Sequence, residues 1–250
     1  MKLLAAIETG TTGFWYGRIT SLIGTHARAT TREGLLKELD EELWYHLGWL
    51  TRNGETAPTI NDPVIEVAEE VIGVSLLGES GGEVAFLRSD EEPVKEEMLQ
   101  RCLRYMGYNR REIIRTVDGL SEAELSYVPP GKGRNIYQIL RHVCNAEEWY
   151  LSRLGADAEA LYEAKLGKPV SEVDLLPVHE RMEAVREAGV AALLELVPAK
   201  NGLTLSRAEY TSYPGERWST RKVLRRYLEH EREHIYNIRE YLGAEPRHYL

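Results

Sequence analysis

Two histidines near the end of the chain, His230 and His234, stand four residues apart in the segment YLEHEREHIYNI, residues 227–238. Four residues of α-helix turn through roughly 400°, so the two imidazoles would lie about 40° apart on one helix face. Side chains at this spacing can bind one metal ion together. Both histidines also fall within the apolar side of the segment, beside Tyr227 and Ile238. Buried imidazoles need hydrogen-bond partners or a metal, and the pair alone leaves both possibilities open.

A third histidine, His142, lies in the segment 135–154, which is also predicted to be helical. Leu140 and Val143 belong to the apolar side of that helix, and His142 lies on its flank, where it can face a neighbouring helix. Three neutral imidazoles with an open fourth position form the ligand set of a catalytic zinc-type site, because structural zinc sites usually close all four positions. Imidazole also binds nickel, copper and iron, so the histidines alone do not identify the metal. The sequence therefore predicts a divalent metal as the cofactor.

Two glutamates are candidate catalytic residues. Glu231 lies on the last helix near its apolar side, and Glu147 follows Val143 by one turn in the segment 135–154. A buried carboxylate can orient a ligand imidazole through its other ring nitrogen, or act as general base toward a metal-bound water or thiol. The alternative is a salt bridge at the helix edge with a nearby arginine, for which the candidates are Arg141, Arg225 and Arg226.

Four segments in the second part of the chain are predicted to be the long helices that position these residues. They span residues 94–117, 135–154, 179–196 and 219–243. Each carries a broad apolar side, and Ser219 or Thr220 is expected to cap the last one. Helices of this kind predict an all-α four-helix bundle.

The first part of the chain has strand-like runs on both sides of one helical segment. A turn-forming TGTTG segment separates two runs rich in apolar and aromatic residues and predicts a β-hairpin. The predicted strands are residues 2–8, 14–20, 25–29, 64–68 and 83–87, and the helix runs from Thr30 or Thr31 to about Asn53. The sequence therefore predicts an α+β domain in which a small antiparallel sheet carries one helix.

A polar segment that ends in proline, SDEEP at residues 89–93, is the predicted linker between the two parts. We therefore expect two domains, an α+β domain over residues 1–90 and a helical bundle over residues 94–250. A chain of 250 residues is long enough for this division.

The acidic charge of the chain lies entirely in its first part. Residues 1–94 carry 7 Lys+Arg and 16 Asp+Glu, a net charge of −9, which leaves 24 of each sign for residues 95–250. Direct contact with a phosphate backbone needs a cationic face, so the sequence predicts no direct nucleic-acid binding. A basic protein partner for the N-terminal domain is the better expectation.

The composition is typical of a globular protein, with 43% hydrophobic and 28% charged residues. No apolar run approaches the roughly 18 residues of a membrane span, and the first residues lack the pattern of a signal peptide. The two cysteines, Cys102 and Cys144, do not form a C-x-x-C pair and are expected to be buried thiols. These features predict a cytoplasmic protein without a membrane segment.

Three stretches of the second part form a recognisable pattern: REIIRTVDGL, SEAELSYVPPGKGRNIYQILRHVCNAEEWYLSRL and GERWSTRKVLRRYLEHEREHIYNI. They resemble the DinB-like superfamily of metal-dependent four-helix bundles, and the resemblance covers about residues 95–243. The resemblance implies that one histidine of the second helix and the H-x-x-x-H pair of the last helix bind a divalent metal. Those positions match His142, His230 and His234, and Zn²⁺ or Ni²⁺ is the implied ion. Some members of the superfamily use a low-molecular-weight thiol as cosubstrate, and such bundles often form homodimers.

The first 60 to 90 residues contain the strand GFWYGRI, a short third strand, the helix start TREGLLKELDEEL and the GETAP segment after it. On these segments the region resembles the HicB-like antitoxin domain. It implies a domain that binds a protein partner. A small α+β domain that only packs or dimerises is the alternative.

Together these features predict a metal-dependent enzyme, and the DinB-like resemblance implies a thiol-dependent transferase or isomerase that acts on a small electrophilic substrate. The three histidines would bind the metal, and Glu231 and Glu147 would be catalytic. The alternative is a non-enzymatic, stress-related interaction protein whose HicB-like domain binds a partner.

Overall fold

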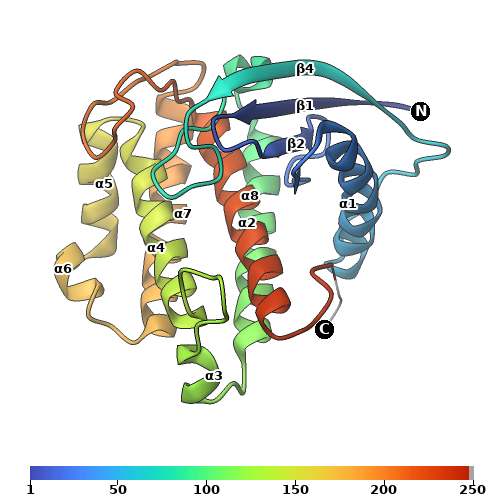
Figure 1. Ribbon diagram of the computed structural model, residues 1–250. Helices are drawn as coiled ribbons and strands as arrows, with labels where there is room; N and C mark the ends of the chain where they lie inside the picture. Colours follow the sequence, from blue (N-terminus) through green and yellow to red (C-terminus); the bar gives the residue numbers. More distant parts are fainter. Residues whose placement is uncertain (248–250) are drawn as a thin grey trace. The chain divides into compact units, whose positions relative to one another are not determined.

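The computed structural model describes residues 1–247, and within them the chain forms two compact units (Figure 1). Unit 1 comprises Met1–Glu92 together with Ala208–Glu216, and unit 2 comprises Pro93–Arg207 together with the chain from Arg217 onward. Residues 208–216, which we expected in the helical domain, therefore belong to unit 1. There the Glu216 carboxylate accepts the backbone N–H of Val84 at 3.1 Å.

Unit 1 contains a four-stranded sheet with the strand order β3-β2-β1-β4. The strands are β1 (Lys2–Gly10), β2 (Trp15–Ile19), β3 (Ala27–Ala29) and β4 (Val64–Val74). The first three form an antiparallel meander, but β4 pairs with β1 in parallel, so the sheet is mixed and not antiparallel as predicted. The reason is the helical crossover: a helix between β3 and β4 returns the chain to the start of the sheet, and such connections join parallel strands.

That crossover helix, α1 (Arg32–Arg52), covers one face of the sheet (Figure 1). It begins where the Thr31 hydroxyl accepts the N–H of Gly34 at 3.0 Å, which satisfies one of the free amides of the first turn. Its buried side packs on alternate residues of β1, which point to the same face because strand side chains alternate. The residues of this core layer include Leu35, Leu39, Leu43, Leu3, Ala5 and Ile7.

Residues 83–87 do not form the predicted strand. Their backbone amides bond to carboxylates in place of a neighbouring strand: the N–H of Val84 to Glu216, and the N–H of Ala85 to Glu8 at 2.6 Å. Ala85 and Leu87 are buried against the sheet face opposite α1. The apolar run therefore reflects burial of an extended segment, which a short 3-10 turn (Arg88–Glu91) follows.

Unit 2 is built on four long helices: α2 (Glu96–Val117), α4 (Ile136–Ser152), α7 (Val178–Ala199) and α8 (Thr220–Tyr241). Helix α8 packs against α2 and α4, and α7 packs against the other sides of the same two helices. The predicted fold class, an α+β part followed by an all-α four-helix bundle, is confirmed. Three shorter helices that we did not predict lie in the connections: α3 (Glu122–Ser126), α5 (Ala156–Leu166) and α6 (Val170–Val173).

The two helices that carry the three histidines start at polar caps. The Asn135 side chain accepts the N–H of Gln138 at 2.8 Å and begins α4, and the Ser219 hydroxyl accepts the N–H of Lys222 at 3.1 Å and begins α8. These caps set the first turn of each helix, and therefore which residues face the bundle interior. Across residues 1–247, no helix combines the length and the apolar character that crossing a bilayer requires.

Candidate metal centre

Helix α8 presents His230 and His234 toward the bundle interior, one turn apart, as their spacing predicted. Each of these two residues is only 8% exposed to solvent. Their Nε2 atoms are 3.1 Å apart, and the ring centroids are 4.4 Å apart with the rings nearly perpendicular. The two rings therefore turn the same nitrogen toward one point.

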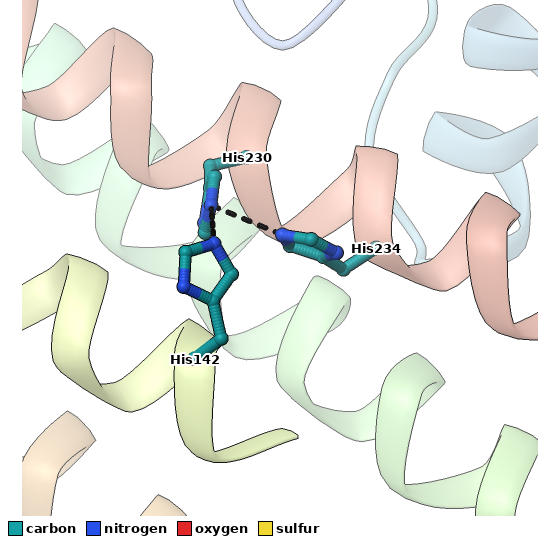
Figure 2. A group of neighbouring side chains, drawn as sticks. All are labelled: His142, His230 and His234. Carbon is teal, nitrogen blue, oxygen red and sulfur yellow. Dashed lines mark hydrogen bonds between the residues drawn. The ribbon is translucent and has the colours of Figure 1, made fainter. Parts of the chain in front are cut away.

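Helix α4 brings His142 to that point (Figure 2). Its Nε2 lies 3.2 Å from the Nε2 of His230, and its ring centroid lies 5.0 Å from that of either partner. Each histidine offers a ring nitrogen within 4.8 Å of the others. We call His142, His230 and His234 the histidine triad. The structure thus brings together all three histidines that the sequence singled out.

Burial favours the uncharged form of His142 and of His230. It lowers the pKa of His142 to about 4, with a further contribution from the positive charge of Arg134. Burial lowers the pKa of His230 well below its usual value too, and the neighbouring imidazoles of His234 and His142 add to this effect. A neutral imidazole keeps a lone pair on one nitrogen, which is the form that binds a metal.

Two of the three nitrogen separations in the triad are close to those around a bound divalent metal. A tetrahedral ion at 2.0–2.1 Å from each nitrogen sets its ligand nitrogens about 3.3 Å apart. The two Nε2 to Nε2 distances, 3.1 and 3.2 Å, are close to that value. Three imidazole nitrogens with no carboxylate among them suit zinc, nickel or copper better than magnesium or calcium, which prefer oxygen ligands. The donor set and its spacing therefore match the cofactor expected from the sequence.

The family model described as Mycothiol-S-transferase matches residues 101–238, more than half of the chain. The match spans both helices that carry the triad. The chain belongs to the mycothiol-S-transferase family. This family is DinB-like, so the resemblance seen in the sequence is confirmed for unit 2.

The match does not reach the predicted HicB-like part, and the HicB-like resemblance finds no support in the comparisons. Searches of curated proteins and of solved structures returned no match.

In this member of the mycothiol-S-transferase family, Glu147 and Glu231 lie in a buried ion network and not at the helix edge. Arg186 donates to Glu147 Oε1 at 2.5 Å, to Glu147 Oε2 at 3.0 Å and to Glu231 Oε2 at 2.8 Å. Arg110 donates to Glu231 Oε1 at 2.6 Å and also to Glu147 Oε1. All four carboxylate oxygens accept a hydrogen bond from an arginine. We call these four residues the Arg/Glu network.

The Arg/Glu network changes what the two glutamates can do. Burial by itself would raise the pKa of Glu147, but Arg110 and Arg186 outweigh it and hold that pKa below its usual value. A carboxylate with a lowered pKa and fully used oxygens is a weak general base. The geometry of the two glutamates favours a positioning role, because their bonds to Arg110 and Arg186 connect α4 and α8, the two triad helices, to α2 and α7.

The predicted arginine partners of the glutamates bond elsewhere. Arg141 donates to the backbone carbonyl of Asp174, and Arg225 and Arg226 pair with Glu229. Sequence reasoning missed Arg110 and Arg186. A signal for them exists, since each lies four residues after a buried methionine, Met106 and Met182 respectively, on the apolar side of its helix.

Aromatic side chains pack beside the triad in this transferase family member. The Tyr150 ring contacts the His230 ring edge-on at a centroid distance of 5.8 Å, and the ring centroids of Tyr150 and Trp218 are also 5.8 Å apart. Trp218 is 1% exposed and Tyr150 5% exposed. The buried Tyr150 ring therefore places aromatic surface directly beside His230.

Proposed function

We propose that the protein is a metal-dependent thiol S-transferase whose metal is bound by His142, His230 and His234. The convergence of three imidazole nitrogens supports the metal, with Nε2 to Nε2 distances of 3.1 and 3.2 Å along the triad. Membership of the mycothiol-S-transferase family supports the reaction class. A low-molecular-weight thiol such as mycothiol is therefore the proposed cosubstrate, and transfer is favoured over isomerisation.

A bound Zn²⁺ or Ni²⁺ would supply a positive charge that lowers the pKa of a thiol, so that the thiolate is available at neutral pH. The sulfur then forms a bond to an electrophilic carbon of the second substrate. The thiol proton passes to solvent, and a leaving group departs with its bonding electron pair. The protein contributes three imidazole ligands, held by α4 and α8, and the aromatic ring of Tyr150 beside them.

The Arg/Glu network has a positioning role in this proposal. It fixes α4 relative to α8, and the gap between those helices determines whether the His142 nitrogen reaches the histidine pair. The catalytic role expected for Glu147 and Glu231 remains a prediction, and their bonding to two arginines argues against it.

Elemental analysis of protein purified without a histidine tag tests the metal. We expect about one equivalent of Zn²⁺ or Ni²⁺ in the wild type and a loss of most of it in His142→Ala and His230→Ala. The exposed His179→Ala is the matched control and should keep the metal. A metal-free wild type, or full occupancy in His230→Ala, would contradict the proposal.

A thiol-consumption assay tests the reaction. The wild type is incubated with mycothiol and a nitro-activated aryl chloride, and the remaining thiol is titrated. We expect metal-dependent consumption of thiol that both triad variants lose and His179→Ala retains. A protein that carries the metal but consumes none of several thiols would refute the S-transfer part and leave the metal site standing.

We also propose a protein-binding function for unit 1, through strand β4. This strand is at the edge of the sheet, so roughly half of its backbone N–H and C=O groups point away from β1. It is 11 residues long, and Val64 and Ile72 are 58% and 74% exposed. An open edge of this length can accept an added strand from a partner.

The negative charge of unit 1 favours a positively charged partner. Three glutamates, Glu66, Glu69 and Glu70, lie on β4, within a segment of net charge −9. Pairing with a second copy would oppose acidic strands, whereas a lysine-rich extended peptide would be attracted. The proposed partner is therefore a basic segment of another protein.

Fluorescence anisotropy with a synthetic peptide of alternating lysine and valine tests this proposal. We expect the full-length protein to bind it and to lose binding when alternate peptide amides are N-methylated, because methylation blocks strand pairing and keeps the charge. Equal binding of both peptides would mean simple charge attraction, and no binding would refute the proposal.

A further inference from the structure

Two cations, Lys132 and Arg134, lie in the loop that leads into α4. The Lys132 Nζ is 3.0 Å from the Oε1 of Glu240 and 5.5 Å from the centroid of the Tyr241 ring, and both of these partners belong to the last turn of α8. The start of α4 therefore lies beside the end of α8, and the two cations lie where these helix ends meet.

The same helix ends are about two turns from the triad. Tyr241 follows His234 by seven residues, which turn through roughly 700°, so the two side chains share one face of α8. Arg134 directly precedes Asn135, the cap of α4, and His142 follows that cap by about two turns. The cations therefore lie near the triad along both of the helices that carry it.

The charge of Arg134 reaches two members of the triad. Burial is the main cause of the lowered pKa of His142, and the positive charge of Arg134 is the next. Burial also lowers the pKa of His230, and Arg134 is again among the contributing charges. Because a Coulomb interaction weakens with distance and with screening by solvent, the guanidinium lies close to both rings.

The two ends of the triad differ in exposure and in charge. Tyr150, which contacts His230 two turns further along α4 than His142, is only 5% exposed. At the other end, Arg134 and His142 are half-buried, and the side chain of Lys132 is 35% exposed. The more exposed end of the triad is therefore the cationic one.

We infer that Arg134 binds an anionic group, such as a carboxylate, on the electrophilic substrate and so determines which electrophiles the protein accepts. This inference rests on the proposed function, since it names the class of that second substrate. A guanidinium suits the role because two of its N–H groups match the two oxygens of a carboxylate. Lys132 adds a second positive charge at the same end of the triad.

Isothermal titration calorimetry with 3,5-dinitrobenzoate and its uncharged methyl ester tests the inference. Both lack a leaving chloride and bind without reacting, and a chelator keeps the protein metal-free, so that the carboxylate cannot bind a metal. We expect the wild type to bind the acid about 10- to 100-fold more tightly than the ester, which corresponds to a hydrogen bond with a charged group. Arg134→Gln should bind the two equally, whereas Arg134→Lys should keep part of the preference and the exposed control Arg115→Gln all of it.

The preference for the acid should also shrink as the salt concentration rises, because it depends on charge. Equal binding of acid and ester by the wild type, no binding of either, or the same loss in Arg115→Gln would overturn the inference. In metal-loaded protein, mycothiol should bind the wild type and Arg134→Gln equally. A loss of mycothiol binding in that variant would assign Arg134 to the thiol and contradict the inference. A wild type that prefers the acid but consumes no thiol would refute the proposed function and leave the anion site standing.

Discussion

The histidine triad and the Arg/Glu network are both buried polar clusters, both use α4 and α8, and they differ in completeness. In the network, two arginines face two glutamates, and all four carboxylate oxygens accept hydrogen bonds. In the triad, three imidazoles turn the same atom, Nε2, toward one another. The network has no net charge, and all of its carboxylate oxygens are hydrogen-bonded. The triad instead consists of three electron-pair donors, which can bind a cation.

This difference separates structural polar groups from ligand-binding ones. Buried polar groups in a finished core find partners of opposite character, because an unpaired one costs free energy. A cluster of like groups, such as three Lewis bases, does not satisfy itself in that way. The contrast yields tests in which the network variants change stability and the triad variants change metal binding.

The largest expected effect is a loss of folding stability when the Arg/Glu network is broken. Arg186→Met removes the guanidinium that bonds both glutamates and leaves two buried carboxylates with Arg110 alone. Breaking a buried pair in this way typically costs about 3–5 kcal/mol. We expect a loss of that size in the free energy of unfolding, measured by urea denaturation.

The exposed Arg115→Met is the control for that measurement, and we expect it to change the same quantity by less than about 0.5 kcal/mol. A loss below about 1 kcal/mol in Arg186→Met would show that the glutamates find other partners, and the contrast between the two clusters would fail.

The next effect concerns the triad. A metal that binds only the folded protein adds about 2.7 kcal/mol at a free concentration 100 times its Kd. Zn²⁺ at such a concentration should therefore stabilise the wild type by that amount and His230→Ala by almost nothing. Paired urea denaturation curves with Zn²⁺ and with a chelator measure it. Equal stabilisation of both proteins would mean that the ion binds elsewhere.

A smaller effect, on the rate of thiol consumption, tests whether Glu231 is a catalytic or a positioning residue. Glu231→Gln keeps the shape of the side chain but removes its charge from Arg110 and Arg186. If Glu231 has only a positioning role, thiol consumption per folded molecule should stay within a few-fold of the wild type. A general base would cost about 10²- to 10⁴-fold in kcat. A loss of that size with full metal occupancy would support the catalytic role.

Local chemistry explains how much of the fold the sequence predicted. The caps and apolar sides of α4 and α8 are short-range features, so the helices and the direction of all three histidines followed from spacing. The parallel pairing of β4 with β1 and the burial of residues 83–87 depend on contacts between distant segments. No periodicity encodes those contacts.

The partners of Glu147 and Glu231 illustrate the same limit. Both glutamates were expected to face inward, and both are buried. Arg110 and Arg186 come from α2 and α7, at sequence separations that range from 37 to 121 residues. Only the packing of all four helices determines which arginine reaches which carboxylate.

The smallest expected effect is that of removing either cysteine. These variants test whether the reactive sulfur belongs to the protein or to a cosubstrate. Cys102 and Cys144 are fully buried, and burial raises the pKa of each thiol to about 12. Near pH 8 both therefore stay protonated and unreactive, since the thiolate is the nucleophile. We expect a disulfide reagent such as dithionitrobenzoate to label neither cysteine in the native protein and both in denaturant.

Cys102→Ala and Cys144→Ala should then keep thiol-transfer activity, because neither sulfur would take part in the reaction. Rapid native labelling of one cysteine, together with loss of activity in its alanine variant, would assign the nucleophile to the chain. The triad would in that case have another role. Protection of both cysteines leaves an external thiol as the source of the transferred sulfur, as the converging histidines lead us to expect.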